Sequence, residues 1–135
     1  MRLWLVVKET FAVHVVENPD SEHDCSSFLA GDWTPPNEER AKERRRLLRL
    51  LEQASKNPRT LSAPCHTIAE GIWQFKVSGG VYRIPWFYDE NKLIICTHYF
   101  VKKGQKTPAS ERDRARRLKD DYFSKKAKGS LEWKE

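Results

Sequence analysis

The chain lacks the features that would mark a disulfide framework, a membrane span or a secreted protein. It has 135 residues but only three cysteines, Cys25, Cys65 and Cys96, at irregular spacing. An odd number of irregularly spaced cysteines argues against a disulfide framework and agrees with a reducing compartment. No segment approaches the roughly 20 apolar residues of a spanning helix, so we expect no membrane partner.

The N-terminal segment MRLWLVVKETF is apolar but short, and no small-residue cleavage site follows it. A secretory signal peptide requires such a site, so we interpret the segment as part of the folded protein and expect a cytoplasmic location. The length suits one domain with a single hydrophobic core.

Positive charge is what the chain has in excess. Its net charge is +6, with 33% charged and 11% aromatic residues. This balance favours a polyanionic partner, and the absence of a long apolar segment makes nucleic acid a better candidate than a membrane.

The middle of the chain contains three runs typical of strands, Ile72–Val77, Val81–Tyr88 and Leu93–Val101. The first two alternate between aromatic or aliphatic and polar residues, which is the period of a half-buried strand. Turn-forming residues separate the runs. If the three strands pair as a meander, the aromatic sides form a core face and the opposite side carries Lys76 and Arg83.

Local signals predict the remaining elements. Leu3–Val7 could be an edge strand or an N-terminal arm. In the run Val81–Tyr88, Pro85 predicts a bulge or an edge position, because proline lacks the N–H that a strand donates to its neighbour. We expect strands at Leu3–Val7 and Ala12–Val16, helices at Cys25–Ala30, Asn37–Ser55 and Pro108–Phe123, and a loop at Arg59–Glu70. The chain is then a single domain over residues 1–123, followed by a flexible polar tail over residues 124–135.

Four motifs follow one another in this order: GIWQFKV, GGVYRI, FVKKGQKTP and a charged helix that ends in RLKDDY. Their order resembles that of the RelE/ParE superfamily of toxins, and in particular its phage-associated HigB-like branch. The similarity extends over most of the chain, from Ala12 to Tyr122. It implies a compact α+β fold with an antiparallel sheet of about four strands, N-terminal helices and a C-terminal helix.

The resemblance also implies a function. The chain would be the toxin of a type II toxin–antitoxin system, a metal-independent RNA endonuclease that cleaves mRNA on the ribosome without a cofactor. Its protein partner would be a cognate antitoxin, of a helix-turn-helix type. Some members of the superfamily instead poison DNA gyrase, so a non-catalytic gyrase inhibitor and an inactive interaction module remain alternatives.

The residues themselves indicate how such cleavage could work. Metal-free RNA cleavage uses the ribose 2′-OH as nucleophile, and it needs proton transfer and cations around a dianionic phosphorane. Arg83 suits the phosphate because its planar guanidinium can hold two oxygens. Lys76 could act as a base, and the ordinary pKa of His98 lies near neutrality. The catalytic candidates are Arg83, Lys76, His98, Lys102, Lys103 and Lys106, and the RNA-binding candidates are Gln74, Gln105, Tyr122, Arg112 and Arg116.

Each candidate also has a purely structural interpretation. Arg83 could be an ordinary strand-surface residue, and the lysines could belong to a solvated loop. His98 could face the core, and the helical spacing of Tyr122 suits a core position. A zinc site at Cys96 and His98, or at Cys65-His66, is conceivable, but no paired cysteine motif supports it and we expect no metal.

Overall fold

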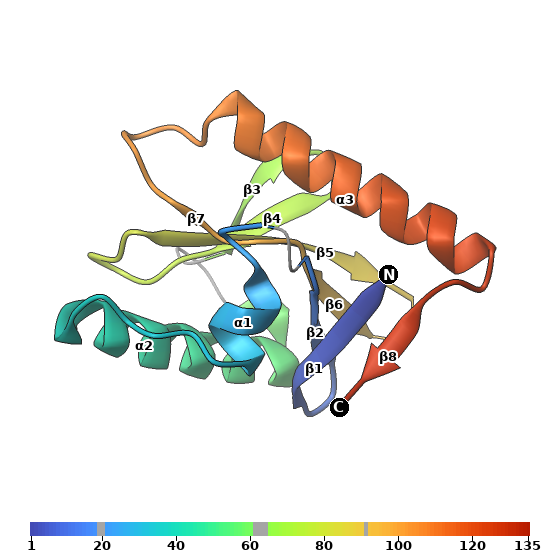
Figure 1. Ribbon diagram of the computed structural model, residues 1–135, viewed down its shortest axis with the longest axis horizontal. Coiled ribbons are helices and arrows are strands. Elements are labelled where there is room, and N and C mark those ends of the chain that lie inside the picture. The colour runs from blue at the N-terminus through green and yellow to red at the C-terminus, as the bar shows by residue number, and fades with distance from the viewer. Residues whose placement is uncertain (19–20, 61–64, 91) are drawn as a thin grey trace.

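The computed structural model describes residues 1–18, 21–60, 65–90 and 92–135, without the side chains of residues 60, 65 and 66. In chain order the elements are β1 (Arg2–Lys8), β2 (Ala12–Val16), α1 (Cys25–Ala30), α2 (Glu38–Lys56), a 3₁₀ turn (Pro58–Thr60), β3 (Cys65–Ala69), β4 (Ile72–Phe75), β5 (Tyr82–Asp89), β6 (Leu93–Cys96), β7 (Phe100–Val101), α3 (Ala109–Ala127) and β8 (Glu132–Lys134). The sheet lies between α3 on one side and α1 with α2 on the other (Figure 1). The expected α+β class is therefore confirmed.

The sheet is larger than the sequence predicted. Within the described residues it has eight strands in the order β3-β4-β5-β6-β2-β1-β8, with β7 paired to β5, where we expected about four. It is also mixed, because β2 pairs with β6 and β1 pairs with β8 in parallel. The N-terminal run forms β1, which has a neighbour on each side, and β3 lies in a segment that we expected to be a loop.

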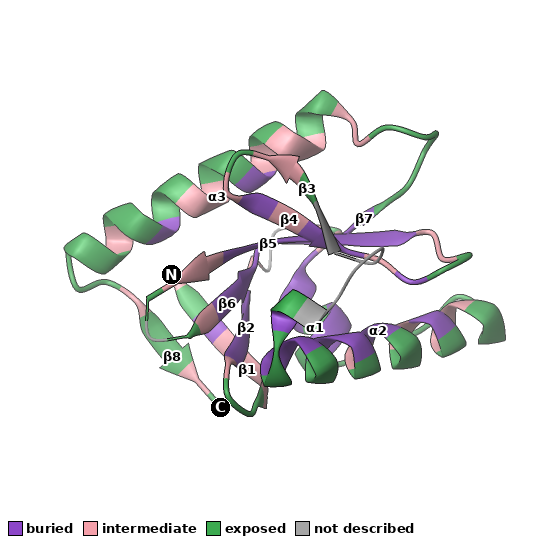
Figure 2. Ribbon diagram, turned by 180° about the vertical axis from the view of Figure 1, so that it is seen from behind, coloured by how far each residue is buried: buried purple, intermediate pink, exposed green. Residues whose placement is uncertain are grey.

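Two sets of buried side chains, one on each face of the sheet, form separate hydrophobic clusters. Phe75, Ile84 and Trp86 belong to the cluster that packs against α1 and α2, and the half-buried Trp73 packs against them. Phe87 belongs to the cluster on the α3 side. Figure 2 shows the buried inner strands between helices whose outer faces are exposed. The predicted aromatic face of β4 and β5 is confirmed, so the polar residues that alternate with it face α3.

Two of the helices, α1 and α2, begin directly after residues whose side chains cap them. Asn37 precedes α2 and accepts a hydrogen bond of 2.9 Å from the N–H of Arg40. Asp24 precedes α1 and accepts from the N–H groups of Asn18 and Ser26 and from the hydroxyls of Ser26 and Ser27. Burial alone would raise the pKa of Asp24, but these bonds outweigh it and hold the pKa below its ordinary value. No helix within the described residues is long and apolar enough to cross a bilayer.

A bulge opposite Pro85 divides the third predicted strand into β6 and β7. Strand β5 pairs with β6 through Trp86 and Cys96 and with β7 through Arg83 and Phe100, so two residues of β5 face three of its partner. The carbonyl of Pro85 accepts the N–H of Thr97 at 2.9 Å, within the bulge. Of the two outcomes predicted from Pro85, the edge position is wrong because Gln74 of β4 pairs with Pro85, and the bulge lies in the partner segment and not in β5 itself.

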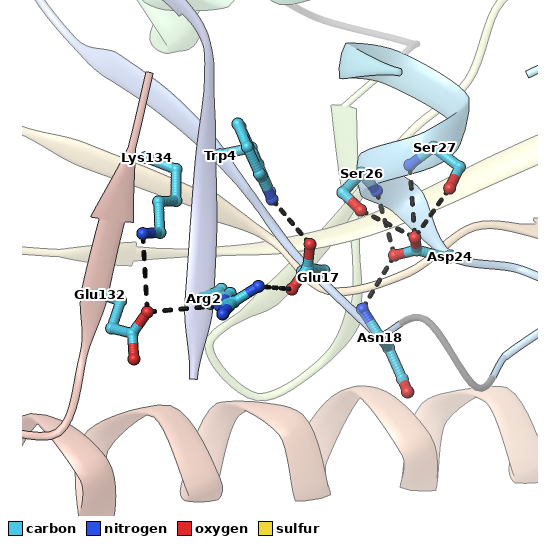
Figure 3. A network of polar contacts seen from close by, with 9 residues as sticks. All are labelled: Arg2, Trp4, Glu17, Asn18, Asp24, Ser26, Ser27, Glu132 and Lys134. Carbon is cyan, nitrogen blue, oxygen red and sulfur yellow. Dashed lines mark hydrogen bonds and ion pairs between the residues drawn. The ribbon is translucent and has the colours of Figure 1, made fainter. Parts of the chain in front are cut away.

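The C-terminal segment contains regular structure where we expected a loose tail. Helix α3 continues four residues beyond Phe123, to Ala127, and β8 pairs with β1. Figure 3 shows Glu132 of β8 in contact with Arg2, which also reaches Glu17 of the segment after β2. Trp4 donates to the same Glu17 at 3.1 Å. These contacts and the strand pairing join the two ends of the chain.

Candidate nucleic-acid interface

A cleft of about 290 Å³ opens on the side of the sheet that faces α3. Strands β3, β4, β5 and β7, the loop 102–107 and the first turn of α3 all contribute to it. We call it the cationic cleft, and its lining residues are Thr67, Ile68, Gln74, Lys76, Arg83, Phe100, Lys102, Gln105, Lys106, Thr107 and Arg112. Among the described residues, five cations and no carboxylate line this cleft. Such a lining is suited to a polyanion.

Arg83 is buried in the wall of the cleft and held by backbone carbonyls. Its Nη1 donates to the carbonyls of Gly80 at 3.1 Å and Tyr82 at 2.9 Å. In the described part of the chain, no carboxylate forms an ion pair with it. Burial lowers the pKa of Arg83 and the charge of Glu43 opposes this, but a guanidinium remains charged at neutral pH. The side chain therefore presents an oriented positive charge to the cleft.

The loop 102–107 is fixed beside Arg83 by contacts with two strands. The N–H of Lys102 donates to the carbonyl of Val81 at 2.7 Å, next to the start of β5. The hydroxyl of Thr107 donates to Oε1 of Gln74 at 3.4 Å. The loop thus contributes Lys102, Gln105 and Lys106 to the lining of the cleft, which Lys76 also lines.

Arg112 reaches the cleft from the first turns of α3. Its Nε–H is buried and has no protein acceptor within the described residues. A buried donor without an acceptor is costly unless a ligand satisfies it. Arg112 adds a second guanidinium, besides that of Arg83, to the lining of the cationic cleft.

A hollow of about 420 Å³ extends the cationic cleft along the turn between β4 and β5. It shares Lys76, Arg83 and Lys102 with the cleft. Arg46 of α2 donates to the carbonyl of Ser78 in this turn at 3.0 Å. The turn is thereby joined to the helix on the opposite face of the sheet.

The structure brings most of the predicted site residues to one cleft. Seven of the predicted residues line the cleft: Gln74, Lys76, Arg83, Lys102, Gln105, Lys106 and Arg112. The sequence did not predict Thr67, Ile68, Phe100 and Thr107. The KTP motif contained a signal for Thr107, but Thr67 and Ile68 come from β3, which the sequence did not predict as a strand.

His98 is not brought to the cleft. It lies in the bulge before β7, is only 2% exposed, and its Nδ1 is 2.9 Å from the hydroxyl of Thr97. Its Nε2 is 3.6 Å from Glu111 of α3. Burial lowers the pKa of His98 to about 3, so the ring is neutral at physiological pH. The expectation of a catalytic histidine at the cleft is corrected, because the bulge turns this side chain into the interior.

Three further candidates also lie outside the cleft. Lys103 lines a second hollow, which adjoins the cationic cleft at Phe100. Arg116 is exposed and pairs with Asp113 one turn earlier on α3, at 3.0 Å. Tyr122 is completely buried and donates to Oδ2 of Asp89 at 2.6 Å. Its position in the core shows why helical spacing with Leu118 was a better guide than its place in the motif.

Among the side chains that the structure describes, no three histidine, cysteine or acidic residues lie together as metal ligands would. The side chains of Cys65 and His66 lie outside the described part.

Comparison with known proteins places the chain in a family but provides no curated relative. The family model described as "Phage derived protein Gp49-like (DUF891)" matches residues 38–120. This region begins with α2 and ends within α3, so it includes every residue of the cationic cleft. A search of curated proteins found no match.

Proposed function

Because the chain belongs to the Gp49-like family of phage-derived proteins, which is related to RelE-type toxins, we propose that it is a toxin that cleaves RNA. In this proposal it is the toxin of a type II toxin–antitoxin pair, of the HigB-like kind, and its substrate is mRNA on the ribosome. A cognate antitoxin neutralises it.

One observation carries the proposal: within the described residues, the cationic cleft has five cations and no carboxylate. A gyrase inhibitor needs a surface for another protein and has no need for cations that converge on one point. Phosphoryl transfer needs that convergence, because negative charge accumulates on the phosphate oxygens in the transition state. The convergence of Lys76, Arg83, Lys102 and Lys106 therefore favours the endonuclease over the two alternatives.

The chemistry follows from the positions of these groups. Arg83 is held rigidly and contacts the scissile phosphate, where it stabilises the phosphorane. The ribose 2′-OH attacks that phosphate and forms a 2′,3′-cyclic phosphate as the 5′ oxygen leaves. No histidine or carboxylate among the described residues lines the cleft, so proton transfer is assigned to lysines. Lys76 is our candidate for the base, and Lys102 or Lys106 for the acid.

Expression of the protein without a partner tests the proposal. Labelled methionine incorporation should fall before thymidine incorporation, and mapping of 5′ ends should find new cuts inside translated messages. The Arg83→Ala variant should produce neither effect. A fall of thymidine incorporation first, without new RNA ends, would instead indicate a DNA enzyme as the target.

A further inference from the structure

A second cleft, of about 740 Å³, adjoins the cationic cleft at Phe100 of β7. Its walls come from β7 and the start of the following loop, from His23, and from the first turns of α3. The residues that matter here are Phe100, Val101, Lys103, Glu111, Arg114 and Arg117. Its volume is within the range of about 300 to 1,000 Å³ of ligand sites in proteins.

The lining of this second cleft combines positive charge with apolar surface. Lys103, Arg114 and Arg117 face one carboxylate, that of Glu111. Glu111 already lies 3.9 Å from Arg114 and 3.6 Å from the buried ring of His98. Val101 is 39% exposed and offers an apolar surface. Single-stranded nucleic acids use both kinds of surface, cations for phosphates and apolar or aromatic groups for bases.

The two clefts adjoin at one residue of β7. Phe100 lines both of them, and the loop that follows sends Lys102 to the cationic cleft and Lys103 to the second cleft. The N–H of Lys102 is fixed to the carbonyl of Val81, and consecutive Cα atoms are only about 3.8 Å apart. A strand held in one cleft can therefore enter the other by passing Phe100.

We propose that the second cleft binds the single-stranded RNA that continues beyond the phosphate held at Arg83. This inference rests on the proposed function, because it assumes that RNA occupies the cationic cleft. Bases leaving that cleft lie against the exposed side chain of Val101, and Lys103, Arg114 and Arg117 contact the phosphates that follow. An acidic segment of an antitoxin is the alternative occupant of the second cleft. Two observations favour a strand that extends through both clefts: Phe100 lines both, and Lys102 lines one while Lys103 lines the other.

Binding of fully 2′-O-methylated RNA, which cannot be cut, distinguishes the two clefts. Wild-type protein is titrated with a trinucleotide and a nonanucleotide of mixed sequence, each labelled with a fluorophore, at several salt concentrations. The Lys103→Ala/Arg117→Ala variant removes two exposed cations from the second cleft. Arg49→Ala/Lys128→Ala removes two exposed cations that line neither cleft and serves as the charge-matched control.

We expect the Lys103→Ala/Arg117→Ala variant to bind the nonanucleotide about tenfold more weakly than the control and the trinucleotide equally well. Its salt slope for the nonanucleotide should be smaller by about 1.4, which corresponds to two lost phosphate contacts on a single strand. Equal nonanucleotide binding by the two variants would overturn the inference. The inference would also be overturned if this variant bound RNA with normal affinity and lost only its affinity for the antitoxin.

Failure of this inference alone and failure of both proposals give different results. If Arg83→Ala weakens both oligonucleotides while Lys103→Ala/Arg117→Ala weakens neither, RNA occupies only the cationic cleft. Absence of salt-dependent binding of either RNA to the wild type would overturn both proposals.

Discussion

The backbone N–H of Tyr82 donates a hydrogen bond of 2.7 Å to Oε2 of Glu43, a carboxylate that is 3% exposed between α2 and β5. The other oxygen of Glu43 pairs with Arg40, one turn earlier on α2. The carbonyls of Gly80 and Tyr82, on either side of this contact, are the two that hold Arg83. A buried carboxylate on one face of the sheet thus fixes the backbone that orients the main cation of the other face.

Replacement of this carboxylate should weaken both stability and the site. Glu43→Ala leaves the buried N–H of Tyr82 without its acceptor, which should lower the free energy of unfolding by about 2 kcal/mol. Activity should fall further than the loss of folded protein explains, because Arg83 loses its fixed support. Denaturant unfolding and RNA cleavage at a matched concentration of folded protein measure the two effects. Glu39→Ala, at an exposed position one turn earlier, should change neither.

Gly80 should resist substitution because of the same carboxylate. A Cβ at this position would overlap Oε2 of Glu43 and lie 2.8 Å from its Cδ. We expect Gly80→Ala to displace Glu43 and to lower the thermal midpoint and the toxicity together. Gly79→Ala is the control, because its Cβ meets nothing within 4 Å and only its φ of +74° is unfavourable, at about 1 kcal/mol. A Gly80→Ala protein that is more stable than Gly79→Ala would contradict this explanation.

Arg83→Ala should abolish toxicity while the protein remains folded. Loss of a phosphate contact that strengthens in the transition state should cost about 3 kcal/mol, or about a hundredfold in rate. Arg83→Lys should recover only part of the activity, since an ammonium cannot reproduce the planar fork. Arg116→Ala removes an exposed arginine outside the cleft and should leave cleavage unchanged. Full activity of a folded Arg83→Ala protein would exclude the mechanism.

Tyr122→Phe should affect stability and not RNA. The hydroxyl donates to Asp89, whose carboxylate also contacts Lys126 at 2.9 Å. Loss of one hydrogen bond to a buried carboxylate should cost about 2 kcal/mol of unfolding free energy. Oligonucleotide affinity, measured well below the thermal midpoint, should equal that of the wild type. A lower affinity with unchanged stability would return Tyr122 to the RNA-binding residues.

His98 should make the protein sensitive to mild acid. Its pKa of about 3 in the folded protein lies below the value of about 6.5 in an unfolded chain, so between these values the unfolded state binds more protons. Its contribution to stability is therefore complete above pH 6.5 and is lost as the pH falls, by up to about 1.4 kcal/mol per unit.

The variant His98→Asn isolates this effect. The unfolding free energy of the wild type should fall between pH 7 and pH 4, and that of the variant should fall less. His14, whose pKa is also lowered by burial, acts in the same range and is present in both proteins. Parallel curves for the two proteins would show that protonation of His98 does not destabilise the fold.

Several parts of the fold could be predicted because they depend on neighbours in the sequence. The start of the helix at Cys25, the alternation around Trp73 and Trp86, and the irregularity at Pro85 follow from backbone geometry within a few residues. The same alternation predicted that Lys76 and Arg83 lie on the face opposite the aromatic core. Two paired strands with known inward faces determine which side chains share the other face.

The remaining features depend on contacts between distant segments, which a local pattern does not contain. Strand β1 is interior because β8, from the other end of the chain, pairs with it. The adjacent residues Lys102 and Lys103 line different clefts because the loop passes between two cavities. His98 faces inward because the bulge packs against α3. The sequence alone determined the charge and the face on which the site forms. The tertiary structure decided which cations converge, because convergence depends on how distant strands and a helix pack.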